Sequence, residues 1–595
     1  MKGGITSGIV YPPAVVELSK TYTFKNIGGT SAGAIAAAVT AAAEYGRQNG
    51  SGGFSEVAKL PEYLGYTVPN GKQSRLFSLF QPQPQTKRLF SILVAGIGNK
   101  GAKPLRIALA VILSFWQYAL VGALPGLILG FTAVSANFEP ARLLFWGTLL
   151  AAALLVLLGI VVLVSWGFYR SVTVNIPENG YGICSGFSSG QDHSKNPMAL
   201  TPWLSRLINR AAGMKEDGPP LTFGHLWQTD RNEAEHKINL QMMTTNLTHG
   251  RPYRLPFSEN VFYFDPSEFR RLFPEEVVGW MDQHAGPSTK YSPLRLLPKA
   301  ADLPVVFAAR LSLSFPFLLS AVPLYAIDYS RPDVDQARPE KCWFSDGGIC
   351  SNFPVHFFDQ ALPRWPTFAI NLRPYHPDYK DSPVWMPNKN VGGIMEWWTR
   401  FDQGSGLARL TGFVGAIVNS MQNWMDNTQT HLPGYRDRVA HISLDESTEG
   451  GINLNMPPFI IKSLSDRGRM AAAMLVDRFT SPAGAHVLSW DNHRWVRYRS
   501  LMNLLQQLVE EVEYSFENPI AGEESYWDLI KRDSDVPPLS YRWLNDEQRW
   551  FGIEATEELL KLVQEWRNGA RDLPTDGFGG RVPRPQPELR VRPKI

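Results

Sequence analysis

A serine flanked by glycines is the strongest candidate for chemistry in this chain. The pentapeptide Gly29-Thr30-Ser31-Ala32-Gly33 has the pattern G-x-S-x-G. Residues 22–27 before it alternate and are rich in aromatic and β-branched side chains, which is typical of a short strand. Residues 34–45 after it are mostly alanine and predict a helix that Gly46 would end. A strand, a tight glycine turn and a helix form a nucleophile elbow, so we expect Ser31 to be exposed at its apex as a nucleophile.

The same pattern occurs a second time, in a different setting. Gly186-Phe187-Ser188-Ser189-Gly190 is followed by a polar stretch that ends at Pro197. A polar run that leads into proline does not begin a helix. We therefore interpret Ser188 as an ordinary loop serine.

A glycine-rich turn near the start of the sequence and an acidic residue far downstream could complete a site around Ser31. Gly3-Gly4-Ile5 begins a turn that continues to Gly8, and backbone N–H groups freed by such glycines can point at an oxyanion. Asp346 follows an apolar, strand-like segment and precedes Gly347-Gly348. An aspartate there could lie beside the serine as its base. The alternative is a solvated turn aspartate, because Asp-Gly is common in turns.

In order and local context, these three motifs resemble those of the patatin-like phospholipases. The matching residues are the Gly3-Gly4 turn, the Ser31 pentapeptide and Asp346-Gly347-Gly348. Residues 243–250 and 308–317 also resemble segments of that family, so that the resemblance covers roughly residues 1–80 and 220–375. It implies an α/β fold with a patatin-like three-layer core and a Ser–Asp dyad without histidine.

The resemblance also implies a role for each residue. Asp346 would accept the proton of Ser31 as Oγ attacks an ester carbonyl, and the N–H groups of Gly3, Gly4, Ile5 and Ala32 would hold the oxyanion. Many members have a third glycine and a basic residue in this loop, where this chain has isoleucine and serine. The substrate would be a phospholipid, lysophospholipid or other acyl ester, hydrolysed through an acyl-enzyme without cofactor or metal.

Two uncharged runs predict membrane-spanning helices. Residues 107–138 and 143–169 carry no charge, and each is long enough to cross about 30 Å of hydrocarbon. The alternative, a buried core helix, rarely stays uncharged over such a length. Basic residues gather on the outer flanks, at 87–106 and at Arg170. By the positive-inside rule we predict a two-pass hairpin in the inner (cytoplasmic) membrane, with the catalytic parts facing the cytoplasm.

Composition narrows the possible partners. The formal net charge of the 595 residues is only +3, so we expect no nucleic-acid partner. Three scattered cysteines do not make a disulfide framework, and the eleven histidines show no metal-ligand spacing.

The sequence divides into segments of different character. These are 1–80 and 170–375 (two parts of the core), 81–106 (a linker or interfacial segment), 107–169 (the transmembrane hairpin), 376–566 (a mainly helical C-terminal region) and 567–595 (a disordered basic, proline-rich tail). Within the C-terminal region, helices are predicted at 406–425, 458–479, 497–516 and 547–566.

These observations together predict a membrane-anchored serine acyl hydrolase whose partners are a membrane lipid or acyl-ester substrate and the bilayer itself. Two alternatives stay open. An acyltransferase would use the same acyl-Ser31 intermediate, and a non-catalytic membrane scaffold would retain a decayed hydrolase fold.

Overall fold

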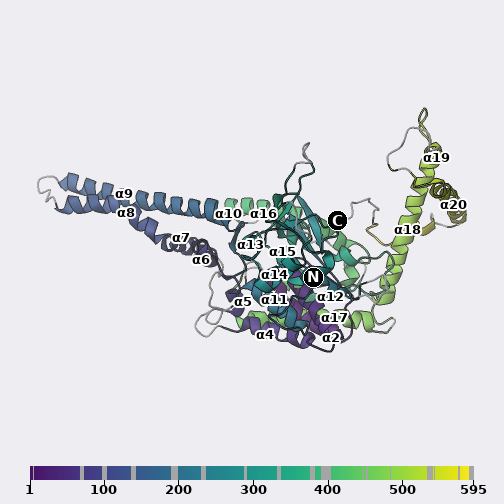
Figure 1. Cartoon of the computed structure of the whole chain (residues 1–595), viewed down its shortest axis with the longest axis horizontal. Coiled ribbons are helices and arrows are strands. Elements are labelled where there is room, and N and C mark those ends of the chain that lie inside the picture. Colours follow the sequence, from purple (N-terminus) through teal and green to yellow (C-terminus); the bar gives the residue numbers. More distant parts are fainter. Residues whose placement is uncertain are drawn as a thin grey trace.

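The computed structural model describes residues 1–4, 6–67, 73–96, 103–135, 142–188, 198–228, 236–286, 291–330, 337–375, 382–389, 404–445, 448–450, 453–482, 484–532, 541, 543–571, 573 and 577–587. The protein has mixed α/β content. A central body carries two projections (Figure 1). One is made by helices α8 (Trp116–Ser135) and α9 (Arg142–Arg170), and the other by α18 (Trp490–Glu517), α19 (Tyr526–Lys531) and α20 (Asp546–Ala570).

A seven-stranded sheet forms the middle of the body. Its order is β1 (Asn26–Gly29), β3 (Asn239–Asn246), β9 (Glu340–Asp346), β8 (Val322–Ala326), β5 (Tyr263–Phe264) and β6 (Arg295–Leu296), with β4 (Arg251–Leu255) paired to β3 off this path. β1 runs parallel to β3, whereas β9 runs antiparallel to it. The carboxyl ends of β1 and β9 lead to Ser31 and Asp346, the two predicted catalytic residues.

The first strand and helix differ in their bounds from those predicted. β1 begins at Asn26 rather than at residue 22 and runs to Gly29. The following helix α2 (Ala32–Gln48) passes through Gly46 instead of ending there. A Cβ on Gly46 would lie 2.4 Å from the carbonyl oxygen of Ala211, so this glycine permits a close helix contact rather than a helix end.

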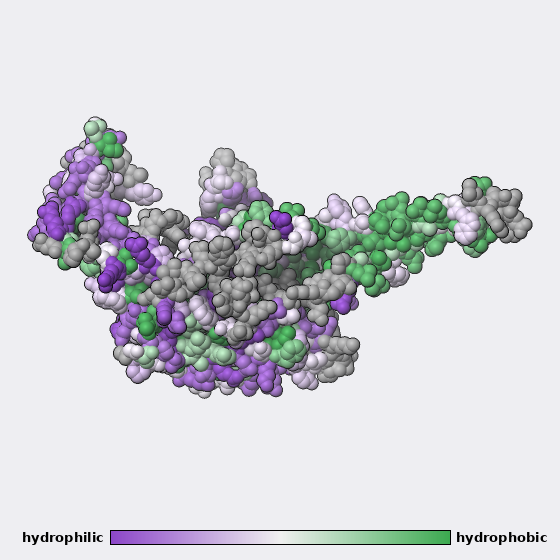
Figure 2. Space-filling model, turned by 180° about the vertical axis from the view of Figure 1, so that it is seen from behind, coloured by the Kyte–Doolittle hydropathy of each residue, from purple (hydrophilic) through white to green (hydrophobic). Residues whose placement is uncertain are grey.

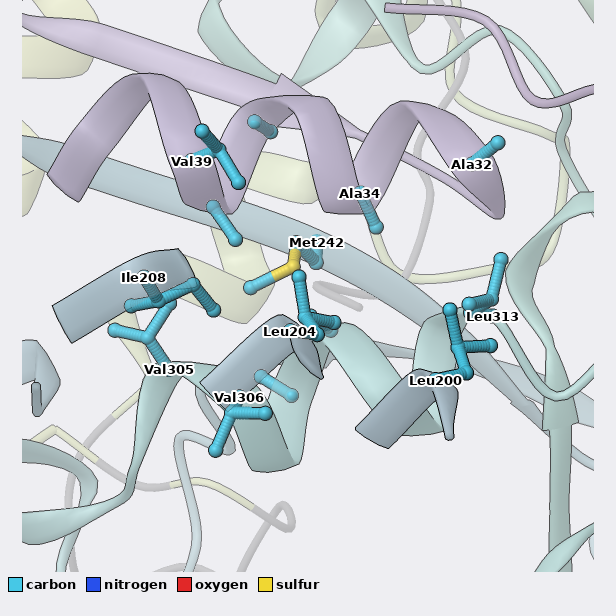
Figure 3. Packing of buried hydrophobic residues seen from close by; sticks show 14 of the residues in the cluster. Ala32, Ala34, Val39, Leu200, Leu204, Ile208, Met242, Val305, Val306 and Leu313 are labelled. Atoms are coloured by element: carbon cyan, nitrogen blue, oxygen red, sulfur yellow. The ribbon is translucent and has the colours of Figure 1, made fainter. Parts of the chain in front are cut away.

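Small residues on α2 let it pack closely within the core. It contacts α11 (Leu200–Ala211) and α15 (Val305–Ser312), while Met242 from β3 points among these helices (Figure 3). Ala34 is fully buried, as are Leu204 and Val305. This packing fixes the start of α2, and therefore Ser31, against the sheet.

A second sheet joins the C-terminal region to the body. Its strands are β10 (Ala369–Pro374), β12 (Val439–Leu444) and β11 (Val384–Trp385), with β10 parallel to β12. Helix α17 (Pro458–Thr480) packs against β12 and α1 (Tyr11–Ser19). A boundary at residue 375 is therefore not a structural one, because β12 and α17 belong to the same body as the first 80 residues.

The first residues of the chain lie between the two sheets. The Met1 ammonium donates to the carbonyl oxygen of Gly28 at 2.9 Å, and Lys2 Nζ donates to that of Leu372 at 2.9 Å. Beside them, a cavity of about 470 Å³ separates the exposed edges of β1 and β10. Residues 1–4 thus bridge two strand edges that do not pair with each other.

In the part of the chain that the structure describes, two helices are long and apolar enough to cross a membrane, α8 (Trp116–Ser135) and α9 (Arg142–Arg170). They lie side by side away from the body, and hydrophobic residues cover their surface (Figures 1 and 2). Gly122 faces Gly159 so closely that a Cβ on either would lie within 2.3 Å of the other's carbonyl oxygen. Such close contact of small residues is the way helices associate in lipid.

We predicted one continuous helix for the first uncharged run, residues 107–138, but the run is interrupted. It divides into α7 (Lys103–Ser114) and α8, and Phe115 at the break is fully buried against Tyr118 and Phe168. Before it, α6 (Lys87–Gly96) buries Leu89 and Phe90 in the core. That part of the predicted interfacial segment therefore packs on protein.

The four predicted C-terminal helices are present, as α16 (Gly406–His431), α17, α18 (Trp490–Glu517) and α20 (Asp546–Ala570). The predicted disorder of 567–595 is wrong for residues 577–587. Phe578 N–H donates to Gln506 Oε1 at 2.8 Å, and its ring packs on Trp566. Residues 588–595 lie outside the described part of the chain.

The remaining named elements are shorter. They are α3 (Phe54–Ala58), α4 (Leu60–Gly65), α5 (Arg75–Ser78), α10 (Ile176–Glu178), β2 (Gly182–Cys184), α12 (Phe223–Trp227), α13 (Pro266–Phe269), α14 (Glu275–Gln283), β7 (Phe317–Leu319) and α19 (Tyr526–Lys531), with short 3-10 or π turns between them.

Candidate active site

Ser31 has the strained backbone of a sharp strand-to-helix turn. Its φ of 54° and ψ of −130° lie outside the regions that non-glycine residues normally occupy. The turn is possible only because Gly29 and Gly33 have no side chains. A Cβ on Gly29 would lie 2.1 Å from the Gly33 carbonyl oxygen, and one on Gly33 would lie 2.5 Å from that of Met1. The elbow predicted from the pentapeptide is present.

The serine is not exposed at the apex as the sequence suggested. Only 4% of Ser31 is accessible, because the glycine turn at the chain start covers it. A Cβ on Gly3 would lie 2.7 Å from the Ser31 Cβ. On the inner side, Ser31 N–H donates to the Ser312 hydroxyl at the end of α15, at 3.2 Å. Ser312 is thus a positioning residue of the elbow.

The strand register brings Asp346 to Ser31. Gly29 lies opposite Met242 on β3, while Asp346 at the end of β9 lies opposite Thr244 on the same strand. Ser31 comes two residues after Gly29 and is therefore level with Thr244 and Asp346. The two predicted catalytic residues meet although 314 positions of sequence separate them.

Burial sets the acid–base character of Asp346. It raises the pKa of Asp346 to about 7, and the Ser31 hydroxyl and the Gly348 N–H oppose this rise by hydrogen bonding. Gly348 N–H donates to Oδ1 at 2.7 Å. Oδ2 is buried without a well-formed hydrogen bond from any described residue, so the serine contact is loose.

The glycines after Asp346 allow two close approaches. A Cβ on Gly347 would lie 2.1 Å from the carbonyl oxygen of Met243, and one on Gly348 would lie 2.8 Å from Asp346 Oδ1. Both predicted turn glycines therefore have a steric reason to be glycine. The solvated-turn alternative for Asp346 is excluded, because only 3% of the residue is accessible.

The predicted oxyanion donors are brought together only in part. Gly3 N–H is occupied, since it donates to the carbonyl oxygen of Asn352 at 3.0 Å. The N–H groups of Gly4 and Ala32 have no acceptor among the described residues, and Ala32 is the first residue of α2, where a helix N-terminus favours negative charge. Ile5 lies outside the described residues. Gly4 and Ala32 are the donors that this geometry leaves available.

Asp426 is an additional residue of the site that we did not predict. From α16 it accepts hydrogen bonds from the Ser351 hydroxyl at 2.8 Å, the Asn352 N–H at 2.7 Å and the Phe353 N–H at 2.9 Å. The Asn352 carbonyl oxygen in turn accepts from the Thr30 hydroxyl at 3.1 Å, as well as from Gly3 N–H. The loop of residues 351–353 therefore connects α16 with both the glycine turn and the elbow.

An apolar cavity of about 90 Å³ begins beside the elbow. Its walls include Ala32 and Ile35 from the first turn of α2, and Leu313 just after α15. A space this size exceeds what one water needs, and its apolar lining disfavours water. The cavity can accept a hydrocarbon group close to the Ser31 backbone.

The other sequence expectations have simple outcomes. Ser188 lies after β2 in a segment without regular structure, and no described helix begins before α11. Among the residues that the structure describes, no group of three or more His, Cys, Asp or Glu side chains could hold a metal ion.

The fold and site define a mixed α/β protein that has a buried serine–aspartate pair and two helices apolar enough to span a membrane. No protein-family model matches the chain. It is 36% identical, over 648 aligned positions, to the protein named "RpoH suppressor" from Rhizobium meliloti (strain 1021), and the match covers all of this chain and 98% of the relative. The chain belongs to the family of that protein, whose name states no reaction, substrate or ligand.

Proposed function

We propose that this protein is a membrane-anchored serine acyl hydrolase of the patatin-like type. The observation that carries the proposal is the pairing of a strained, buried Ser31 with Asp346 beside an apolar cavity. A pKa of about 7 suits Asp346 to act as a base near neutral pH. Strained backbones and carboxyl groups with raised pKa values gather at active sites.

In the proposed reaction, Ser31 Oγ attacks the carbonyl carbon of an ester while Asp346 takes the serine proton. The N–H groups of Ala32 and Gly4 hold the negative oxygen of the tetrahedral intermediate. Collapse of this intermediate expels the alcohol, which leaves with the proton from Asp346. A water molecule then attacks the acyl-Ser31 ester, with Asp346 as its base, and releases the carboxylic acid.

The position of the cavity supports a lipid acyl group as substrate. Leu79 and Phe80, which precede the α8–α9 pair, line the cavity together with Leu318 and Leu319 of β7. β7 pairs with β2, which follows α9 and α10. The cavity is therefore lined by the segment that precedes the apolar helices and by a strand paired with the segment that follows them. If α8 and α9 enter a bilayer, an acyl chain has a short apolar path to Ser31.

The same reasoning leads us to propose a two-pass protein of the inner membrane with its body in the cytoplasm. Lys87 and Arg88 on α6 and Arg170 at the end of α9 stand at the body end of the pair. Basic residues at that end favour retention on the cytoplasmic side.

The experiment that tests the proposed function is ester hydrolysis by detergent-purified protein, with phospholipid vesicles and a p-nitrophenyl ester as substrates. Wild-type protein should hydrolyse both, and Ser31→Ala and Asp346→Asn should reduce the rate to background while both variants still unfold cooperatively, at temperatures no lower than that of wild type. A fluorophosphonate probe should label wild type and not Ser31→Ala. An inactive, unlabelled wild type would overturn the proposal.

One observation favours the non-catalytic scaffold as the second candidate. The Gly3 N–H, expected to hold an oxyanion, already donates to Asn352. Among the described residues, two N–H donors, those of Gly4 and Ala32, remain for an oxyanion hole. Since each donor contributes about 3–4 kcal/mol, fluorophosphonate labelling decides between a formed hole and none. Acyl transfer is distinguished by adding an alcohol acceptor and measuring new ester.

A further inference from the structure

Helix α16 turns its apolar side chains away from the protein. A stripe of residues three or four apart is exposed, each with 45–73% of its surface accessible: Leu407, Leu410, Val414, Ile417, Met421 and Trp424. Between Gly406 and Trp424 the sequence has one charged residue, Arg409. A surface helix of a globular protein ordinarily turns its apolar face to the core. In α16 the apolar stripe is exposed instead.

The face of α16 opposite the stripe is held to the body at Asp426. Asp426 lies on the side opposite the stripe, about 150° around the helix from its centre at 100° per residue. Only 4% of Asp426 is accessible, and it binds the 351–353 loop through three hydrogen bonds. These hydrogen bonds fix the rotation of α16 about its own axis. The exposure of the stripe therefore follows from how the helix is anchored.

We propose that the stripe on α16 rests on a lipid surface, the same one that the α8–α9 pair enters. In the projection of Figure 1, α16 and α10 both appear at the body end of the projecting pair. The exposed apolar surface of α9 continues past its end, where Val172 and Val174 are 41% and 39% accessible. A contiguous apolar surface of this kind marks a membrane or protein contact. Trp424 and Arg409 are residue types that favour the membrane interface.

The contact with lipid would act on the candidate site through Asp426. The helix holds the loop whose Asn352 carbonyl receives the Gly3 N–H and the Thr30 hydroxyl. A lipid surface that restrains α16 therefore also restrains the glycine turn above Ser31. The lipid contact itself is independent of the proposed hydrolysis, and it is testable without any substrate.

The test places an environment-sensitive fluorophore on each side of α16. Ile417→Cys and Asn419→Cys are matched, since both residues are exposed and point about 160° apart. The background carries Cys350→Ser, which leaves only the buried Cys184 and Cys342. The full-length protein is reconstituted in phosphatidylcholine–phosphatidylglycerol vesicles that contain brominated acyl chains, and a third label at Leu157→Cys on α9 reports whether the pair is in the bilayer.

We expect brominated lipid to quench the labels at 417 and 157 severalfold and to leave the label at 419 unchanged, while aqueous iodide quenches only the label at 419. Quenching of 417 by iodide and not by lipid would overturn the inference. The inference would also be overturned if neither quencher reached the label at 417 and cysteine cross-links formed between chains. That result would indicate that a second copy of the protein covers the stripe. If lipid quenches 157 but not 417, the α16 contact fails while the membrane anchor stands.

Discussion

The two G-x-S-x-G segments of this chain have different surroundings, although their patterns are the same. Ser31 lies between β1 and α2 with a φ of 54°, and Asp346 lies beside it. Ser188 follows β2 in a segment without regular structure. What separates them is the packing around each one. At Ser31, glycines at 29 and 33 permit contacts with carbonyl oxygens that any side chain would prevent.

The comparison shows what the G-x-S-x-G pattern does. Its glycines make room for a tight turn, but the pattern alone does not make the serine reactive. A Cβ on Gly186, the first glycine of the second segment, would contact the side chains of Thr201 and Arg310. A Cβ on Gly29 would instead contact the backbone of Gly33 in the helix that follows. Among the described residues, which do not include 189–197, no helix begins at Ser188. A nucleophile elbow needs the helix, the close backbone approach and the acid together.

The largest expected effect is the contrast between Ser31→Ala and Ser188→Ala. Loss of the nucleophile should lower ester hydrolysis by on the order of 10⁴- to 10⁶-fold, because the covalent route disappears. The change at Ser188 should leave the rate within about twofold, as for a residue that takes no part in the reaction. Initial rates with a p-nitrophenyl ester measure both.

Thermal unfolding of the same two proteins is the control. Comparable unfolding temperatures would assign the difference in rate to chemistry. Equal rates for Ser31→Ala and Ser188→Ala would end the distinction drawn between the two segments.

A smaller effect is expected when a methyl group is added within the elbow. In Gly33→Ala the new Cβ would lie 2.5 Å from the Met1 carbonyl oxygen and 2.9 Å from that of Lys2. The turn must shift, and a shift of 1 Å can cost on the order of 10²-fold in rate. The rate of fluorophosphonate labelling should fall accordingly.

Gly415→Ala on α16 is the matched control, because no atom lies within 4 Å of a Cβ there. Alanine in an exposed helix should stabilise the protein by about 0.5–1 kcal/mol and leave labelling unchanged. Normal labelling of Gly33→Ala would show that the Met1–Lys2 contact does not position the serine.

Much of the fold could be predicted because the informative patterns are local. The alanine-rich run gives α2, and the uncharged runs give the two apolar helices. The division at Phe115 could not be predicted, since it depends on packing against Phe168 far along the sequence. The order of residues 577–587 likewise depends on contacts with α18, which composition does not contain.

Some residues of the candidate site could likewise be predicted from local sequence, whereas others depend on tertiary packing. Ser31 and Asp346 stand in motifs with strict glycine spacing, so the sequence reveals them. Asp426 occupies an ordinary helical position, and only the tertiary structure brings its carboxylate to the 351–353 loop. The hydrogen bond of the Gly3 N–H could not be predicted either, because its acceptor, the Asn352 carbonyl oxygen, is far away in the sequence.

Removal of the charge at Asp426 should have a moderate effect. Asp426→Asn replaces with an amide the carboxyl group that accepts hydrogen bonds from Ser351, Asn352 and Phe353, so we expect kcat to fall about tenfold. As a positioning residue it should leave KM for a water-soluble ester and the midpoint of the pH profile unchanged. Asn427→Ala, an exposed neighbour, is the control. A shifted pH midpoint would mean that Asp426 acts on Asp346 directly.

The smallest expected effect is a pH-dependent gain of stability in Asp346→Asn. Burial raises the pKa of Asp346 from 3.8 to about 7, so the folded protein binds a proton more tightly than the unfolded chain. The carboxyl group therefore favours folding below pH 4, and this contribution is lost as the pH rises through 7. Asparagine is neutral throughout. The variant should unfold at a higher temperature than wild type at pH 8 and at nearly the same temperature at pH 4. In wild type, hydrolysis should rise with a midpoint near pH 7, because the base must be ionised to take the serine proton. A difference in unfolding temperature that does not vary with pH would mean that Asp346 is ionised in the folded protein across this range. The burial that destabilises the ionised carboxylate is the same burial that makes it a base at neutral pH.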